Sequence, residues 1–184
     1  MYICTNKETA EVVKGNYETA ITKSEKAIKV HSIKKRPTTN ANKRKTAKEK
    51  AYLARKEFNP YLYRAWFLMA ESQFRRGEFI EAASTYNYIL RLYSTQPDIV
   101  CVAKARLARC YVALEWAYDA EDILGKMKRD SITPKGVVEK ECTEAAYRIL
   151  TQQYKEAIPC LKTAIKATHE KVERARLNFL LGQL

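Results

Sequence analysis

The residue types most often used in catalysis and metal binding are scarce in this chain. Its 184 residues include two histidines, His31 and His169, which stand apart, and no HExxH motif, GxSxG motif or glycine-rich phosphate loop. The five cysteines are odd in number and form no CxxC pair, which favours neither a disulfide framework nor a metal site. We therefore expect no enzyme activity, no metal and no cofactor.

Long apolar runs, glycine and proline are also scarce. No run approaches the roughly 18 apolar residues of a membrane-spanning helix, and five glycines with five prolines are typical of a helical protein. The start, MYICTNKETAEVV, lacks a basic segment followed by an apolar core, so we expect no signal peptide in the chain as printed. The chain ends at FLLGQL, within an expected helix. We expect it to be a fragment of a longer protein.

Four stretches of the chain share one pattern. They begin at Gly15, Gly77, Glu115 and Gln152, and each has an alanine five residues later, with apolar residues at helical intervals beyond it. A helix that packs closely on a neighbour needs a small side chain at the point of nearest approach, and repeats of this length stack into solenoids. The pattern predicts an all-α solenoid of antiparallel helix pairs. The four alanines are Ala20, Ala82, Ala120 and Ala157.

An apolar helical segment precedes the later repeats, as in RAWFLMAESQF and KARLARCYVAL. Helix, turn and alanine-centred second helix together resemble the tetratricopeptide repeat (TPR), although Glu115 replaces the turn glycine. The fourth unit departs further, because it lacks an apolar pair near Glu144 and Arg148 and has Pro159 just past the first turn of its second helix. The best matches to the motif are Trp66, Ala70, Gly77, Phe79, Ala82 and Tyr86.

The spacing of the alanines indicates one insertion. The intervals are 62, 38 and 37 residues, against about 34 for this repeat. The extra residues lie in the polar stretch from His31 to Pro60, which has Pro37 and Pro60 near its borders. We expect a loop from Lys34 to Thr46 and then a short helix from Ala47 to Phe58. We expect one continuous domain, with a degenerate first unit at 1–31, the insert at 32–58 and further units within 59–184. These further units lie at about 59–96, 97–131 and 134–168, followed by a truncated unit at 171–184.

The positive charge is concentrated in the insert. The net charge is +13, and residues 23–56 alone contain 13 Lys and Arg against two Glu. Such a loop can bind phosphate groups or an anionic membrane, but the stretch lacks the interleaved aromatics of nucleic-acid sites, so a solvated loop is the favoured interpretation. The candidate basic residues are Lys34, Lys35, Arg36, Lys43, Arg44 and Lys45.

The resemblance to tetratricopeptide repeats implies that the first helices line a concave protein-binding groove. Arginine there pairs with carboxylates and stacks on aromatic rings, which suits an acidic extended or helical segment. The aromatic stripe from Trp66 to Tyr88 is assigned mainly to packing between helices. The groove residues implied are Arg64, Phe67, Glu71, Arg75, Ala105 and Arg109.

A finer resemblance lies in the strings HSIKKRP and EFNPYLYRAWFLM and in their order along the chain. From about Gly15 to Leu184 the sequence is similar to the amino-terminal part of the TPR lipoprotein of gliding motility and type IX secretion in Bacteroidota, the PorW/SprE type. That family is periplasmic, anchored at the outer membrane, and couples the secretion translocon to other parts of the machine. The chain has no lipid-attachment motif of its own, so the resemblance implies membrane contact only through an anchor absent from this sequence.

The expected function is therefore a non-enzymatic protein–protein interaction scaffold of the type IX secretion machinery, with other secretion components as partners and no small-molecule substrate. Two alternatives remain open. One is a cytoplasmic TPR adaptor or chaperone. The other is nucleic-acid binding through the basic insert.

Overall fold

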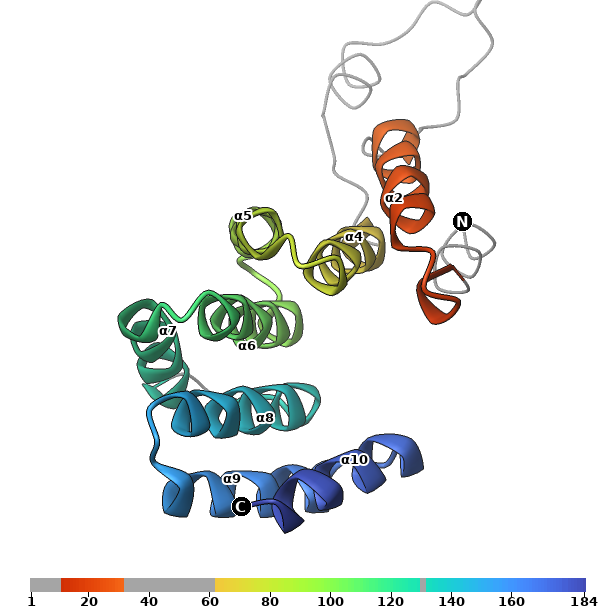
Figure 1. The fold of residues 1–184 in the computed structure, drawn as a ribbon. Coiled ribbons are helices and arrows are strands. Elements are labelled where there is room, and N and C mark those ends of the chain that lie inside the picture. The colour runs from red at the N-terminus through yellow and green to blue at the C-terminus, as the bar shows by residue number, and fades with distance from the viewer. Residues whose placement is uncertain (1–10, 32–61, 130–131) are drawn as a thin grey trace, which may run out of the picture. The chain divides into compact units, whose positions relative to one another are not determined.

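The computed structural model describes residues 11–31, 62–129 and 132–184, and this part of the chain is helical with no β-strand (Figure 1). The all-α prediction is confirmed. The basic insert and its expected short helix lie outside the described residues. The helices are α2 (Tyr17–His31), α4 (Tyr63–Arg75), α5 (Phe79–Leu92), α6 (Pro97–Ala113), α7 (Ala117–Arg129), α8 (Pro134–Leu150), α9 (Tyr154–Ala167) and α10 (Lys171–Gly182).

The chain divides into two compact units, residues 1–72 and 73–184, with the boundary inside α4. In the first unit, residues 11–13 are helical and are followed by a turn at Gly15 and then by α2. Lys23 on α2 reaches back across this turn, and its Nζ lies 2.7 Å from Glu11 Oε1. The ion pair joins the two arms of the hairpin.

The four repeated turns have the same backbone conformation. Gly15, Gly77, Glu115 and Gln152 have φ values of 79°, 83°, 59° and 61°. At each turn this residue donates its N–H to the carbonyl three residues earlier, and the next residue donates to the carbonyl five residues before it, as in Glu78 N to Gln73 O at 3.0 Å. This is the Schellman motif, which ends a helix with a left-handed residue. The internal repeat read from the sequence is thus a repeat of backbone geometry, and the turns lie where the pattern placed them.

The four repeated alanines are fully buried, with 0% of their surface exposed. Ala120 of α7 packs with Ala108 of α6, and Ala157 of α9 packs with Ala145 of α8. A methyl group at these positions lets the two helices of a pair approach closely, as the sequence pattern predicted.

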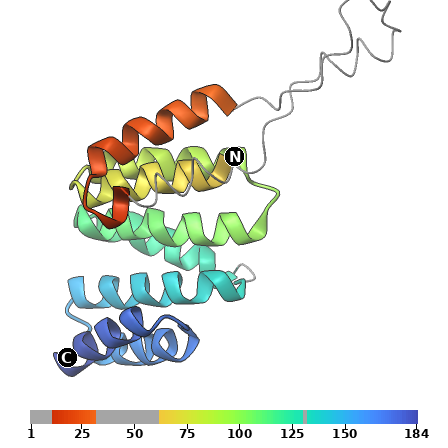
Figure 2. The same ribbon diagram turned by 90° about the vertical axis from the view of Figure 1, so that its right-hand side faces the viewer.

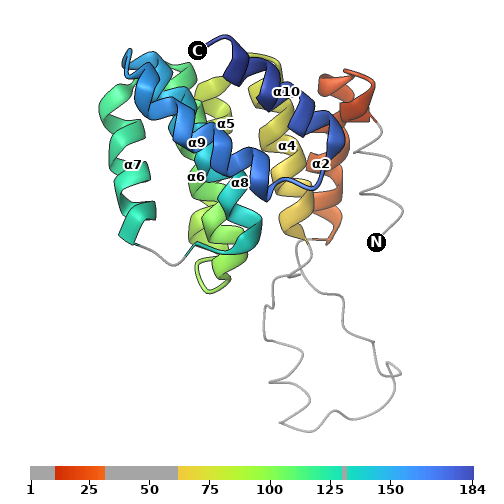
Figure 3. The same ribbon diagram turned by 90° about the horizontal axis from the view of Figure 1, so that it is seen from below.

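Helix α6 is central to the second unit, where it packs against α5, α7 and α8 (Figures 1 and 2). Helix α8 packs in turn against α6, α7 and α9, and α9 lies beside α10 (Figure 3). This arrangement is compatible with an α-solenoid. One core joins α6, α7 and α8 through Ala108, Ala120, Leu124 and Tyr147, and a second joins α8, α9 and α10 through Ala145, Ala157, Leu161, Ala164 and Leu177.

Helix α8 passes very close to α6 at Gly136. A Cβ atom built on Gly136 would overlap Cys101 Sγ and would lie 3.1 Å from Cys101 Cβ. A little further along, the Thr143 hydroxyl lies 3.2 Å from the Ala105 carbonyl oxygen of α6 and 2.8 Å from the Glu139 carbonyl oxygen of its own helix, so its one proton is shared between them. Small or short side chains therefore set the separation of these two helices.

Charged residues replace apolar ones on part of α8. Glu144 stands 37 residues after Leu107, a core residue of α6, and is itself buried. Its carboxylate lies 3.3 Å from Arg148 Nη2 and 3.7 Å from Lys140 Nζ, and Arg148 also lies 2.8 Å from Glu156 of α9. The apolar pair that the sequence lacks at this point is replaced by an ion-pair network between α8 and α9.

Helix α9 continues through Pro159, its sixth residue. The proline ring removes one backbone donor, a change that helices tolerate best near their N-terminus. The Thr163 hydroxyl donates to the Pro159 carbonyl oxygen at 2.9 Å, one turn further on. The deviation from the repeat pattern at this residue does not interrupt the helix.

Candidate functional site

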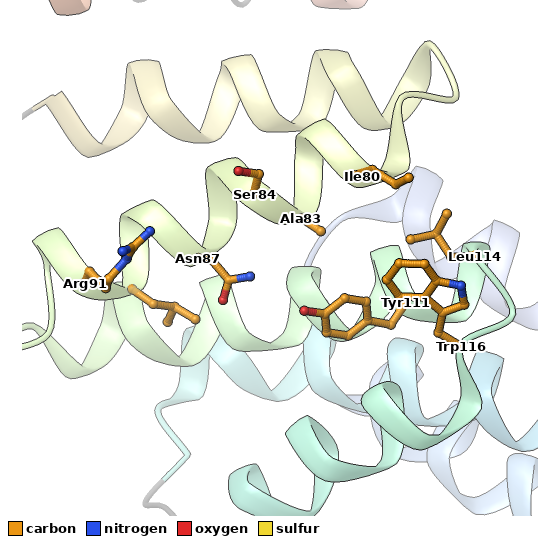
Figure 4. A pocket seen from close by; sticks show the side chains of 9 residues that line it. Ile80, Ala83, Ser84, Asn87, Arg91, Tyr111, Leu114 and Trp116 are labelled. Carbon is orange, nitrogen blue, oxygen red and sulfur yellow. The ribbon is translucent and has the colours of Figure 1, made fainter.

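A groove of about 490 Å³ runs along α5 in the second unit (Figure 4). One face of α5 forms its first wall, and the end of α6 with the turn after it forms the other. We call this feature the α5 groove. It is lined by Ile80, Ala83, Ser84, Asn87, Leu90 and Arg91 of α5, by Tyr111 and Leu114, and by Trp116.

The groove wall on α5 follows from the helical repeat. Its residues recur every three or four positions, so they share one face of the helix. The face turned away from the groove contains Ala82, Tyr86 and Ile89, which are all fully buried. Helix α5 packs against α6, and the groove lies along the face of α5 opposite its buried residues.

One end of the groove is apolar and aromatic. The Tyr111 and Trp116 rings are stacked, with centroids 6.0 Å apart and planes inclined by 22°. The turn at Glu115 sets this pairing, since the Trp116 N–H donates to the Tyr111 carbonyl oxygen at 2.9 Å. Trp116 is nevertheless 47% exposed, and Ile80 is 58% exposed. Large apolar side chains therefore stand open to solvent at this end.

The other end of the groove combines Leu90 with polar side chains. Asn87 is half-buried, and Arg91 is exposed one turn further along α5. Neither side chain has a hydrogen bond or ion pair with any residue that the structure describes. Figure 4 shows Ser84 and Asn87 between the aromatic end and Arg91. The groove thus runs from an apolar platform to a cation.

The residues predicted to form a groove on the first helices fall in both units. Arg64, Phe67 and Glu71 belong to the first unit, where Arg64 is exposed and the other two are half-buried. The remaining three belong to the second unit, where Arg75 is exposed.

Ala105 and Arg109 are both engaged within the second unit. Ala105 is fully buried and packs with Cys101 and Met127, so it offers no surface to a partner, which corrects the expectation for this residue. Its place on α6 turns it toward α7. The Arg109 guanidinium lies 4.2 Å from the centroid of the Phe74 ring, close enough for a cation–π interaction.

Sequence reasoning missed the α5 groove, because it placed the binding surface on the first helices alone. Of the aromatic stripe that it assigned mainly to packing, Tyr86 is fully buried and Tyr88 is 40% exposed, and neither lines the groove. The repeat pattern does not mark the groove. The position three residues after the turn is Ile80 or Tyr118 in two repeats, both exposed, but a charged residue in the other two, and Tyr118 does not line the groove.

The predicted basic residues Lys34, Lys35, Arg36, Lys43, Arg44 and Lys45 lie outside the described residues. In the ranges that are described, no group of three or more His, Cys, Asp or Glu could hold a metal ion. Likewise, none of the helices in those ranges is both long and apolar enough to cross a bilayer.

Several perturbed groups lie on α8 and α9, and none of them lines the α5 groove. Burial lowers the pKa of Lys140, but its hydrogen bond to Glu141 and the charges of Glu141 and Glu144 outweigh this effect, so the pKa is raised. Burial, reinforced by Glu173, raises the pKa of Cys142 to about 12. Burial also raises the pKa of Cys160. Thiols held in the protonated form are poor nucleophiles.

No family model, curated protein or solved structure matches the chain.

Proposed function

We propose that this protein is a non-enzymatic protein–protein interaction scaffold, built from helix pairs of the tetratricopeptide type, that binds a segment of a partner protein in the α5 groove. One observation carries the proposal. Ile80 and Trp116, two large apolar side chains, are 58% and 47% exposed at the end of a groove whose walls are fixed by buried helix faces.

The exposed apolar surface gives a partner its driving force. Covering roughly 100 Å² of it would contribute about 2.5 kcal/mol, at about 25 cal/mol for each Å² removed from water. Aromatic anchors in preformed pockets supply much of the affinity of protein interfaces. Trp116 is such an anchor, because its stacking on Tyr111 holds the indole in place before a partner arrives.

The chemistry of the groove suits a peptide better than a metabolite. The polar side chains of its lining are few: Ser84, Asn87 and Arg91 are spread along α5, and the Tyr111 hydroxyl of α6 points toward Asn87 (Figure 4). A small-molecule site usually encloses its ligand and directs several polar groups at it. An open groove along a helix instead accommodates a linear segment, which can extend beyond both ends.

The partner's identity is supported by the sequence resemblance alone. The PorW/SprE-type strings favour a component of the type IX secretion and gliding machinery, which would place the groove in the periplasm. A cytoplasmic TPR adaptor is the alternative. Fractionation of the source cells, with periplasmic and cytoplasmic marker enzymes followed in parallel, separates the two, since each places the protein with a different marker.

The binding proposal is tested by selecting a random peptide library on phage against the immobilised full chain. We expect enriched peptides whose binding to the purified protein is weakened at least tenfold by Trp116→Ala. Ile80→Ser is the second groove variant, and it should weaken the same peptides. Tyr118→Ala is the matched control, because Tyr118 is 89% exposed on α7 and does not line the groove.

Circular dichroism and urea unfolding of each variant establish that the fold is intact. Enrichment of no peptide at all contradicts the proposal, as does enrichment of peptides that neither groove variant weakens. Peptides that are insensitive to both groove variants but lose affinity with Arg75→Glu would move the interface to the predicted groove on the first helices.

A further inference from the structure

We infer that the α5 groove takes an extended, acidic peptide segment, in which an apolar or aromatic side chain occupies the Ile80 and Trp116 end and a carboxylate pairs with Arg91 about five residues away. This inference rests on the proposed function and specifies the chemistry of the partner. It depends on the charge of the groove, on the unmet hydrogen-bonding capacity of Asn87, and on the length of the groove wall.

The charge of the groove selects an acidic partner. Arg91 is the one charged side chain among the residues that line it. No described residue pairs with the Arg91 guanidinium, and the side chain is exposed. A planar guanidinium binds a carboxylate through two parallel hydrogen bonds. A basic residue of a partner at this end would meet a like charge with no neutralising acid in the groove lining.

Asn87 favours an extended backbone over a helix. Its side-chain amide is half-buried between the two ends of the groove and has no hydrogen-bond partner among the described residues. An amide side chain donates and accepts at once, and so matches the N–H and C=O of an extended chain. A bound helix uses those groups internally and would bury the Asn87 amide without a hydrogen-bond partner, which weakens binding.

The length of the wall sets the spacing of the recognised residues. Ile80 and Arg91 are 11 residues apart on α5, a rise of about 16.5 Å at about 1.5 Å per residue. An extended peptide advances about 3.3 Å per residue, so about five residues cover the same distance. Asn87, about 10.5 Å from Ile80 along the axis, would meet the peptide backbone about three residues from the anchor.

The test uses the peptides enriched on the full chain that depend on Trp116. We expect most of them to contain Asp or Glu about five residues from an apolar or aromatic anchor. Replacing that acid by its amide, or making Arg91→Gln in the protein, should each weaken binding about three- to tenfold. Arg91→Glu should be rescued by a peptide with Lys in place of the acid. Lys162→Gln, which removes an exposed charge from α9, should leave affinity unchanged.

Methylation of the peptide backbone nitrogen about three residues from the anchor tests the role of Asn87. It should weaken binding to the parent protein several-fold and have a much smaller effect on Asn87→Ala, because the two changes remove the same hydrogen bond.

The outcomes separate the two proposals. Peptides that depend on Trp116 but show no acidic preference, or that bind more tightly when locked as helices, would overturn this inference and leave the scaffold function intact. If no selected peptide is weakened by either groove variant, binding in the α5 groove is contradicted, and the inference with it.

Discussion

The four repeated turns allow a stability experiment whose sign is set by backbone geometry. Two of the left-handed positions are already glycine, while Glu115 and Gln152 have side chains at φ values of 59° and 61°. A side chain in this conformation brings its Cβ close to the following carbonyl oxygen. Replacing Glu115 or Gln152 by glycine should therefore stabilise the protein.

The expected gain is the difference between two terms. The left-handed conformation destabilises the folded state by about 1–2 kcal/mol for a residue with a side chain, and glycine removes this cost. Glycine also makes the unfolded chain more flexible, which lowers the free energy of unfolding by about 0.4–1 kcal/mol. The net stabilisation at each turn is about 0.5–1 kcal/mol. The two turns share no hydrogen bond, so the double variant should combine the gains and raise Tm by roughly 2–6 °C for a chain of this length.

Urea unfolding followed by circular dichroism at 222 nm measures the difference. Gly77→Ala is the reverse experiment and should destabilise by about 1 kcal/mol through φ alone, because nothing lies within 4 Å of the added Cβ. Peptide binding should not change in Glu115→Gly, since glycine preserves the turn that positions Trp116. A loss of stability in both glycine variants would refute the shared turn geometry.

Three further predictions concern residues of the second unit. Gly136→Ala should destabilise by about 1–2 kcal/mol, because overpacking against Cys101 outweighs the better helix propensity of alanine, and Cys101→Ala should restore most of the loss. Gly125→Ala on α7, where nothing lies within 4 Å of the new methyl group, should instead stabilise by about 0.5–1 kcal/mol in the same urea titration. Cys142, with its pKa raised to about 12 by burial, should react with iodoacetamide far more slowly in native protein at pH 8 than in urea, as followed by mass spectrometry. Its reaction should speed up as pH rises toward 12, and stability should fall over the same range, because the unfolded thiol loses its proton first.

Periodicity predicted the features that depend on local sequence. The spacing from each turn to its alanine located the turns and the close contacts of the helix pairs, because a Schellman turn and a buried methyl group are both properties of one hairpin. The repeat pattern also identified the part of α8 that departs from it, where Glu144 takes the place of an apolar residue.

The α5 groove could not be predicted in the same way. A pattern of apolar residues shows which side chains share a face, but not which part of that face the next helix leaves uncovered. Nothing in the sequence pattern distinguishes Trp116 and Ile80 from apolar residues that pack between helices, and only the structure shows that they are 47% and 58% exposed. Ala105 was expected to line a binding surface, but it is buried, because Met127 of α7 packs against it.

The central claim is that a partner segment lies on Trp116, and the fluorescence of this residue tests it directly. The chain has two tryptophans, so Trp66→Phe leaves Trp116 as the sole indole. Titration of this variant with a peptide selected on the full chain should shift the indole emission to shorter wavelength, with the same midpoint as binding measured by calorimetry. A peptide that binds in the calorimeter while the emission of Trp116 stays unchanged would show that the partner lies elsewhere, and would contradict the account.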